Sequence, residues 1–223
     1  MNFDLIIFDC DGTLVDSEYL NNLATIQILH EVGLTQYDMK YAFAHFVGRR
    51  MKNILSDLEK ETGHVFAPDM AQRYINRVQE LGPQYLKEMP GARDIVETAL
   101  NKNKKICVAS NGQRDNVIQG LELASLRKYF ADEHIFTAVE VPNGKPAPDL
   151  FLHTLKKMNA VPERSIVIED SVAGVTGAVA AGLKTYGFVS HPDDAEAYAE
   201  RLLEAGAASV FMSLIHIKQA LFS

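Results

Sequence analysis

The feature that most restricts the fold is a series of short, uninterrupted apolar runs that each end abruptly at polar residues. The clearest is 5–8, and similar runs occupy 105–109, 165–168, 185–189 and, more weakly, 209–211. Apolar runs without alternation are typical of strands that are buried on both faces of a parallel sheet. We therefore expect a central parallel sheet.

Segments with helical periodicity separate these runs. They occupy 91–103, 114–123, 149–158 and 172–181. Strands that alternate with helices predict an α/β fold, in which a doubly wound parallel sheet carries helices on both faces. The sequence thus predicts a Rossmann-like core.

Residues 16–87 interrupt this alternation. They contain amphipathic helical segments around 20–32, 51–61 and 70–86, and no clear strand. We expect residues 1–15 and 88–223 to form the α/β catalytic core, and residues 16–87 to form an inserted, all-helical cap domain.

Composition and charge restrict the class of protein. Of the 223 residues, 47% are hydrophobic and 23% are charged, as in ordinary globular proteins. The net charge of −7 argues against a nucleic-acid partner, and no apolar stretch is long enough to span a membrane. Two cysteines form no disulfide framework. We expect a cytoplasmic monomer. A basic segment, 102–105, follows a predicted helix, where cations suit the helix dipole and require no partner.

Polar side chains follow three of the predicted strands at the point where each strand ends. They are Asp9 and Asp11, Ser110 and Asn111, and Glu169 and Asp170. In an open α/β sheet, ligands bind outside the carboxyl ends of the strands. Four carboxylates would repel one another there unless a cation lay among them, and Mg²⁺ prefers oxygen ligands. The sequence therefore predicts a magnesium site at this edge.

A lysine completes the expected chemistry. Lys145 lies in a loop in which prolines flank Ala147 and so restrict the backbone. A lysine, a cation, the Ser110 hydroxyl and loop N–H groups can stabilise the negative charge of a phosphoryl group in transfer. Asp9 could attack phosphorus and form an aspartyl-phosphate. Asp11 could protonate the leaving oxygen and then activate water.

These segments resemble the motifs of the haloacid dehalogenase-like phosphatases. Residues 8–17 (FDCDGTLVDS) are similar to the first motif, 110–112 to the second, 145–146 to the third and 169–171 to the fourth. The four occur in the family's order, and the resemblance extends over essentially the whole chain. Motifs that match together are far more specific than any one alone.

The resemblance implies specific roles. Asp9 would be the nucleophile and a metal ligand, and Asp11 the general acid/base, whose backbone carbonyl also reaches the metal. The implied set comprises the catalytic residues Asp9 and Asp11, the phosphate-binding residues Gly12, Thr13, Ser110, Asn111, Gly112 and Lys145, and the metal ligands Asp9, Asp11, Glu169 and Asp170. The sequence leaves open whether Glu169 contacts the metal directly.

The helical insertion resembles the small cap of the subgroup that includes β-phosphoglucomutase and sugar-phosphate phosphatases. Segments 9–18 and 110–112 are most similar to bacterial 6-phosphogluconate phosphatases. Related caps carry a substrate-specificity loop where Gly48, Arg49 and Arg50 stand here. Arg50 could bind a substrate carboxylate or phosphate in bidentate fashion, although a solvated helix start explains it equally well.

One departure from the subgroup bears on the reaction. β-Phosphoglucomutase has a cap histidine after the first motif, whereas residues 17–22 contain none. We therefore expect a Mg²⁺-dependent phosphatase that acts on a small phosphorylated metabolite, such as a sugar or sugar-acid phosphate. The alternatives are a sugar-phosphate mutase and a non-catalytic sensor of a phosphorylated metabolite.

Overall fold

The chain divides into two compact units. The computed structural model describes residues 2–46, 49, 51–190 and 195–223. The first unit comprises Met1–Asp16 and Lys87–Ser223, and the second comprises Ser17–Leu86. The expected boundaries, at 15/16 and 87/88, each lie one residue from these.

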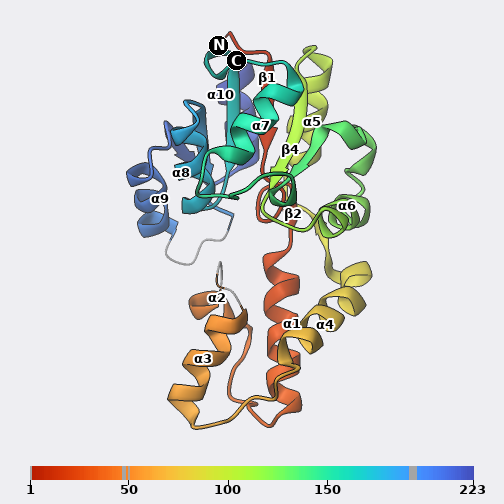
Figure 1. The fold of residues 1–223 in the computed structure, drawn as a ribbon, viewed down its shortest axis with the longest axis vertical. Helices are drawn as coiled ribbons and strands as arrows, with labels where there is room; N and C mark the ends of the chain where they lie inside the picture. The colour runs from red at the N-terminus through yellow and green to blue at the C-terminus, as the bar shows by residue number, and fades with distance from the viewer. Residues whose placement is uncertain (1, 47–48, 50, 191–194) are drawn as a thin grey trace. The chain divides into compact units, whose positions relative to one another are not determined.

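A six-stranded parallel sheet forms the centre of the first unit (Figure 1), with the strand order β5-β4-β1-β6-β7-β8. The strands are β1 (Leu5–Phe8), β4 (Lys105–Ser110), β5 (Ile135–Thr137), β6 (Ser165–Glu169), β7 (Lys184–Phe188) and β8 (Ser209–Phe211). Every neighbouring pair is parallel. The predicted doubly wound α/β fold is confirmed.

Helices cover both faces of this sheet (Figure 1). They are α5 (Ala92–Asn101), α6 (Arg114–Leu123), α7 (Asp149–Met158), α8 (Val172–Ala180), α9 (Ala195–Glu204) and α10 (Leu214–Phe222). In β1, Leu5 and Ile7 join the apolar cluster that contains Phe151 of α7, whereas the ring of Phe8 lies against Phe130. Every side chain of β1 is fully buried. Burial on both faces explains why its sequence is continuously apolar.

The sequence did not predict β5, α9 and α10 of this unit. Strand β5 has only three residues, which is too short for a periodic pattern. The strand expected at 185–189 also begins and ends one residue earlier, at Lys184 and Phe188.

The regular elements in the described part of the second unit are all helices. Its helices are α1 (Glu18–Glu31), α2 (Met39–His45), α3 (Met51–Thr62) and α4 (Met70–Tyr85). They enclose an apolar core of their own, which includes Ile28, Leu29 and Met70. Helix α2 was not predicted, although Asp38 is a typical N-cap and accepts a hydrogen bond from the Tyr41 N–H at 2.8 Å.

A short antiparallel pairing joins the two segments of the first unit where the chain leaves it and returns. Strand β2 (Val15–Asp16) pairs with β3 (Lys87–Glu88), and Asp16 lies opposite Lys87. We expected no strand between residues 16 and 87, and these two elements correct that expectation at its ends. Two-residue strands leave no readable pattern in a sequence.

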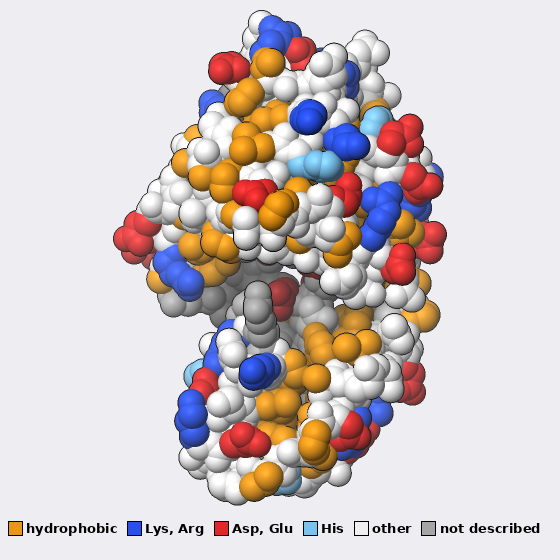
Figure 2. Space-filling model, viewed as in Figure 1, with side chains coloured by type: hydrophobic (Ala, Val, Ile, Leu, Met, Phe, Trp, Pro, Cys, Tyr) orange, Lys and Arg blue, Asp and Glu red, His pale blue; other side chains and the backbone are white. Residues whose placement is uncertain are grey.

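The surface and the helices set further limits. On the face drawn in Figure 2, acidic and basic side chains are interspersed with apolar ones over the described surface. That face therefore presents no broad patch of a single charge. Among the described residues, none of the helices combines the length and the apolar character that crossing a bilayer would demand.

Candidate active site

Three neighbouring strands bring the predicted residues to one edge of the sheet. Strand β1 lies between β4 and β6, and Phe8 is in register with Val108 and Ile168. The Asp9 N–H donates to the carbonyl of Ile168 at 3.0 Å, which extends the pairing one residue beyond β1. Because the strands are parallel, their carboxyl ends meet at a common edge.

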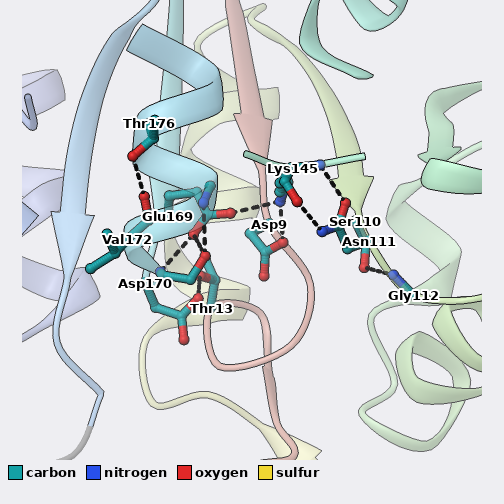
Figure 3. A network of polar contacts seen from close by, with 12 residues as sticks. Asp9, Thr13, Ser110, Asn111, Gly112, Lys145, Glu169, Asp170, Val172 and Thr176 are labelled. Atoms are coloured by element: carbon teal, nitrogen blue, oxygen red, sulfur yellow. Dashed lines mark hydrogen bonds and ion pairs between the residues drawn. The ribbon is translucent and has the colours of Figure 1, made fainter. Parts of the chain in front are cut away.

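Lys145 lies between two buried carboxylates (Figure 3). Its Nζ is 2.5 Å from Asp9 Oδ1 and 2.6 Å from Glu169 Oε1. Asp9 and Lys145 are each 8% exposed, and Glu169 is fully buried. The structure thus brings together three residues that lie far apart in the sequence.

The pKa values at this site reflect two buried carboxylates that share one ammonium. Burial raises the pKa of the Asp9 carboxyl to about 8; Lys145 opposes this effect, whereas the Glu169 and Asp11 charges add to it. Burial disfavours the charged form of Lys145, yet Asp9 and Glu169 hold the pKa of its ammonium above the ordinary value. Two buried carboxylates sharing one ammonium leave an excess of negative charge.

Both oxygens of Glu169 have hydrogen-bond partners from the protein. Oε1 accepts from Lys145, and Oε2 accepts from the backbone N–H and the hydroxyl of Ser171, at 2.7 and 2.9 Å. Ser171 is also the N-cap of α8, where its hydroxyl accepts from the Gly174 N–H at 3.0 Å. Both oxygens of Glu169 are therefore engaged within the protein, and one of them holds Lys145.

Two glycines leave room for these carboxylates. A Cβ atom at Gly174 would lie 1.7 Å from Glu169 Oε1, and one at Gly12 would lie 2.0 Å from Asp170 Oδ2. Gly12 also has a φ of +81°, which disfavours side chains. Gly174 was not identified from the sequence, because the pattern reveals no contact between its helix and the preceding strand end.

The loop after β1 is held by hydrogen bonds of its own. The N–H groups of Gly12 and Thr13 donate within the loop to the carbonyls of Val15 and Cys10, at 2.8 and 3.3 Å. The phosphate-binding role that we expected of both residues stays a prediction. The Thr13 hydroxyl donates to Asp170 Oδ1 at 3.4 Å. Gly12 and Thr13 therefore shape the loop and place Asp170.

Hydrogen bonds also hold the loop after β4. The side-chain amide of Asn111 donates to the carbonyl of Lys145 at 2.9 Å and accepts from its N–H at 2.8 Å. The Gly112 N–H donates to the Ser110 hydroxyl oxygen at 3.0 Å. Asn111 and Gly112 therefore hold the backbone of this site. The phosphate-binding role that we expected of Ser110, Asn111 and Gly112 stays a prediction.

Arg50 lies outside the described residues. Its neighbour Arg49 is described and exposed, and its guanidinium pairs with Asp57 of α3 at 2.5 Å. Arg49 therefore already has an acidic partner within the second unit.

The donor chemistry of the site suits a hard divalent cation. Asp9, Asp11 and Asp170 all act on the Cys10 thiol, whose pKa is raised first by burial and then by these carboxylates, so the three lie near one another. They offer only oxygen donors, which Mg²⁺ prefers. Among the described residues, however, no three acidic, histidine or cysteine side chains converge into a ready-made metal site. Lys145 already supplies one positive charge to Asp9 and Glu169.

Comparisons with known proteins agree with this arrangement. The profile of the haloacid dehalogenase-like hydrolases matches residues 6–188. The 6-phosphogluconate phosphatase of Escherichia coli (strain K12) is 30% identical over 190 residues, which cover 85% of this chain and 84% of that protein. The phosphorylated carbohydrates phosphatase of Thermotoga maritima is 32% identical over 214 residues, which cover 93% of each.

A solved structure is similar along nearly the whole chain. A haloacid dehalogenase family hydrolase from Deinococcus radiodurans R1, solved with bound phosphate and sodium, superposes with a TM-score of 0.86 at 30% sequence identity. The match covers 99% of this chain and 95% of that one.

Proposed function

This chain belongs to the haloacid dehalogenase-like hydrolase family, and we propose that it is a Mg²⁺-dependent phosphatase that uses Asp9 as its nucleophile. Its substrate is a small phosphorylated metabolite, and its reaction is the hydrolysis of a phosphoric monoester. The observation that carries the proposal is the buried contact of 2.5 Å between Asp9 and Lys145 at the carboxyl ends of the central strands.

The first step forms a covalent intermediate. A carboxylate oxygen of Asp9 attacks phosphorus, an Asp9 O–P bond forms, and the ester P–O bond breaks. Asp11 gives its proton to the departing oxygen. Lys145 holds Asp9 in place and offsets negative charge beside the phosphoryl group, and the Ser110 hydroxyl would donate to a phosphoryl oxygen.

The second step restores the enzyme. A water molecule attacks phosphorus, Asp11 accepts the water proton, and the Asp9 O–P bond breaks to release inorganic phosphate. Asp9, Asp11 and Asp170 would hold Mg²⁺, which supplies positive charge for the transferring group when it is bound. Glu169 and Asn111 are positioning residues: Glu169 fixes the side chain of Lys145, and Asn111 fixes its backbone.

The named relatives support a narrower choice of substrate. The two curated phosphatases act, by name, on 6-phosphogluconate and on phosphorylated carbohydrates. We therefore propose a sugar phosphate or sugar-acid phosphate as the substrate. The cytoplasmic location and the monomeric state stay predictions.

Replacement of Asp9 by Asn tests the mechanism. Asp9→Asn should fold and should lose magnesium-dependent release of phosphate from p-nitrophenyl phosphate, because an amide is a poor nucleophile. Asp4→Asn is the matched control, because Asp4 is exposed near the opposite end of β1, and it should retain the activity. Substantial phosphate release by Asp9→Asn would exclude the covalent route.

Product analysis separates hydrolysis from the two alternatives. A panel of phosphorylated sugars and sugar acids should yield inorganic phosphate. Conversion of a hexose 1-phosphate into a 6-phosphate would identify a mutase instead. Tight binding without turnover across the panel would identify a sensor.

A further inference from the structure

A second cavity lies in the first unit, at the end of β4 opposite to the catalytic edge. Its volume is about 520 Å³, and Lys105, the first residue of β4, is among the residues that line it. Ser110 ends the same strand at the catalytic edge. At roughly 3.3 Å per residue, the two sites are about 17 Å apart along the strand.

The lining of this cavity is cationic. Four of its ten lining residues are Lys104, Lys105, Arg127 and Lys128, and no aspartate or glutamate is among the ten. This is unusual in a chain whose net charge is −7. Positive charge that is concentrated in a hollow of an acidic protein attracts anions.

The positive charges of the three lysines are not neutralised by acids. Lys104 Nζ donates to the carbonyl of Phe3 at 2.6 Å, and Lys105 Nζ donates to the carbonyl of Met158 at 3.1 Å. These acceptors are neutral, so each ammonium keeps its charge and two further donors. The ion pairs between described residues include none of the three lysines.

Three of the acidic side chains nearby already have partners. Arg127 pairs with Asp132, Asp4 pairs with Arg164, and Glu97 accepts a hydrogen bond from the Tyr129 hydroxyl. Arg127 is thus the one lining cation that already has an acidic partner among the described residues, and the lysines supply the remaining charge.

A helix dipole does not explain the whole cluster. Lys104 and Lys105 follow the end of α5, where cations are favourable without any ligand. Arg127 and Lys128, however, belong to a separate 3₁₀ turn, Arg127–Tyr129, more than twenty residues later in the sequence. Two distant segments therefore supply cations to the same hollow.

We propose that this cavity binds a small, multiply charged phosphate compound that also carries an apolar part, such as a nucleoside triphosphate. The lysines would contact the phosphates. The apolar part would rest on Leu100, which is 39% exposed and lines the cavity together with the buried Ile106 and Phe130. The volume lies in the range of small-molecule sites. The proposal is independent of the phosphatase function, because none of these residues belongs to the catalytic edge.

Binding to the full chain tests the proposal. ATP, tripolyphosphate and adenosine are titrated separately by calorimetry in EDTA, so that no turnover supported by Mg²⁺ occurs. We expect ATP to bind most tightly, tripolyphosphate to bind more weakly, and adenosine not to bind. Lys105→Gln/Lys128→Gln should weaken ATP binding by about tenfold or more, because two of the four lining charges are removed.

A charge-matched variant gives the control. Lys156 and Lys157 are exposed in the last turn of α7 and do not line the cavity. Lys156→Gln/Lys157→Gln should bind ATP like the unaltered chain, and both double variants should keep magnesium-dependent phosphate release. Equal weakening in the two variants would overturn the site, as would the absence of ATP and tripolyphosphate binding at millimolar concentration. Equal affinities for tripolyphosphate and ATP would overturn the apolar contact.

Discussion

Lys145 is the residue on which the electrostatics of the catalytic edge depend. Its ammonium is shared by Asp9 and Glu169, and all three groups are almost completely removed from water. Removing one partner of a buried ionic group leaves uncompensated charge, which typically costs about 3–5 kcal/mol. The stability and the chemistry of this site therefore depend on the same side chain.

Lys145→Met should lower the free energy of unfolding in EDTA by about 3–5 kcal/mol and abolish phosphate release. Urea denaturation of the metal-free protein provides the measurement. Lys157→Met removes an equal charge from an exposed position and should leave the midpoint almost unchanged. An unaltered unfolding free energy for Lys145→Met would show that the two carboxylates do not need the ammonium.

The metal-free protein should lose stability as the pH rises. Burial raises the pKa of Asp9 from 3.8 to about 8, so the folded state binds a proton that the unfolded state releases. This contribution is fully present below about pH 4 and is lost as the pH rises through about 8. In EDTA, the Tm should therefore fall between pH 5 and pH 8.

Asp9→Asn isolates this effect, because it removes the titrating group. Its Tm should change less over the same pH interval, and added Mg²⁺ should stabilise the unaltered protein more at pH 8 than at pH 5. Parallel Tm curves for the two proteins would assign the pH dependence to other groups.

Gly174→Ala sets two opposing effects against each other. Alanine in place of glycine favours a helix by about 1 kcal/mol. Its Cβ would lie 1.7 Å from Glu169 Oε1, however, and overpacking of this kind costs about 1–3 kcal/mol. We expect the overlap to dominate, so the variant should have a lower Tm and slower phosphate release. Thr176→Ala, at an exposed position of α8, is the control and should keep the Tm and the rate of phosphate release of the unaltered protein. A Gly174→Ala variant that is more stable than the unaltered protein would show that Glu169 can move aside.

At the scale of elements, a two-arginine clamp joins α1 to α4 in the second unit. Arg73 and Arg77 contact the two oxygens of Glu31 at 2.5 and 2.6 Å. Hydrogen bonding from Arg73 is the largest influence on the carboxyl and lowers the pKa of Glu31. Glu31 therefore stabilises the folded state above its ordinary pKa of 4.5, and this stabilisation is lost as the pH falls below that value.

Glu31→Gln should destabilise the protein by no more than about 1 kcal/mol, because the carboxylate is 38% exposed and screened by water. Thermal unfolding at pH 7 should show the loss, and the difference from the unaltered protein should shrink at pH 3.5 and in high salt. The exposed Glu122→Gln on α6 is the control. A difference that is independent of pH and salt would indicate lost packing instead of lost charge.

The elements that were predicted well are those with a long and regular pattern. Helices α6 and α7 begin and end where the sequence placed them. Strand β5 and the pair β2–β3 were missed, because two or three residues cannot establish a period. The strand ends could be predicted, since an apolar run stops at a polar residue.

The detailed contacts of the site could not be predicted in the same way. Asn111 bonds to the backbone of Lys145, which lies 34 residues later in the sequence. Glu169 bonds to the side chain of Lys145 across 24 residues. Such pairs depend on how the loops fold back. For the same reason, the sequence predicted Asn111 at the phosphate and left open whether Glu169 contacts the metal directly.

At the scale of the whole molecule, each unit has its own apolar core. The main cluster of the first unit, which includes Ile7, Phe151 and Val167, has no member from the second. The cluster of the second unit likewise consists only of residues of that unit. Each unit therefore contains an apolar cluster built from its own side chains.

Replacement of residues 17–86 by Asn-Gly should leave a folded first unit. Asp16 and Lys87 are opposite each other in an antiparallel pair, and Asn-Gly is the favoured two-residue hairpin turn. A cooperative unfolding transition and dispersed amide resonances would support this prediction. The same chain with Pro-Pro in place of Asn-Gly is the control. It should fold less well, because Pro-Pro is unsuited to this turn. A molten or aggregated Asn-Gly chain would show that the second unit is needed for folding.

The pairing of β2 with β3 also bears on how such a protein can change during evolution. Because the polypeptide departs and re-enters at facing positions, a segment of any length can be exchanged between them without moving a residue of the central sheet. Inserted sequences can then diverge freely while the nucleophile and its lysine keep their places. Exchange of this one segment would then change the substrate specificity while the hydrolytic residues stay the same.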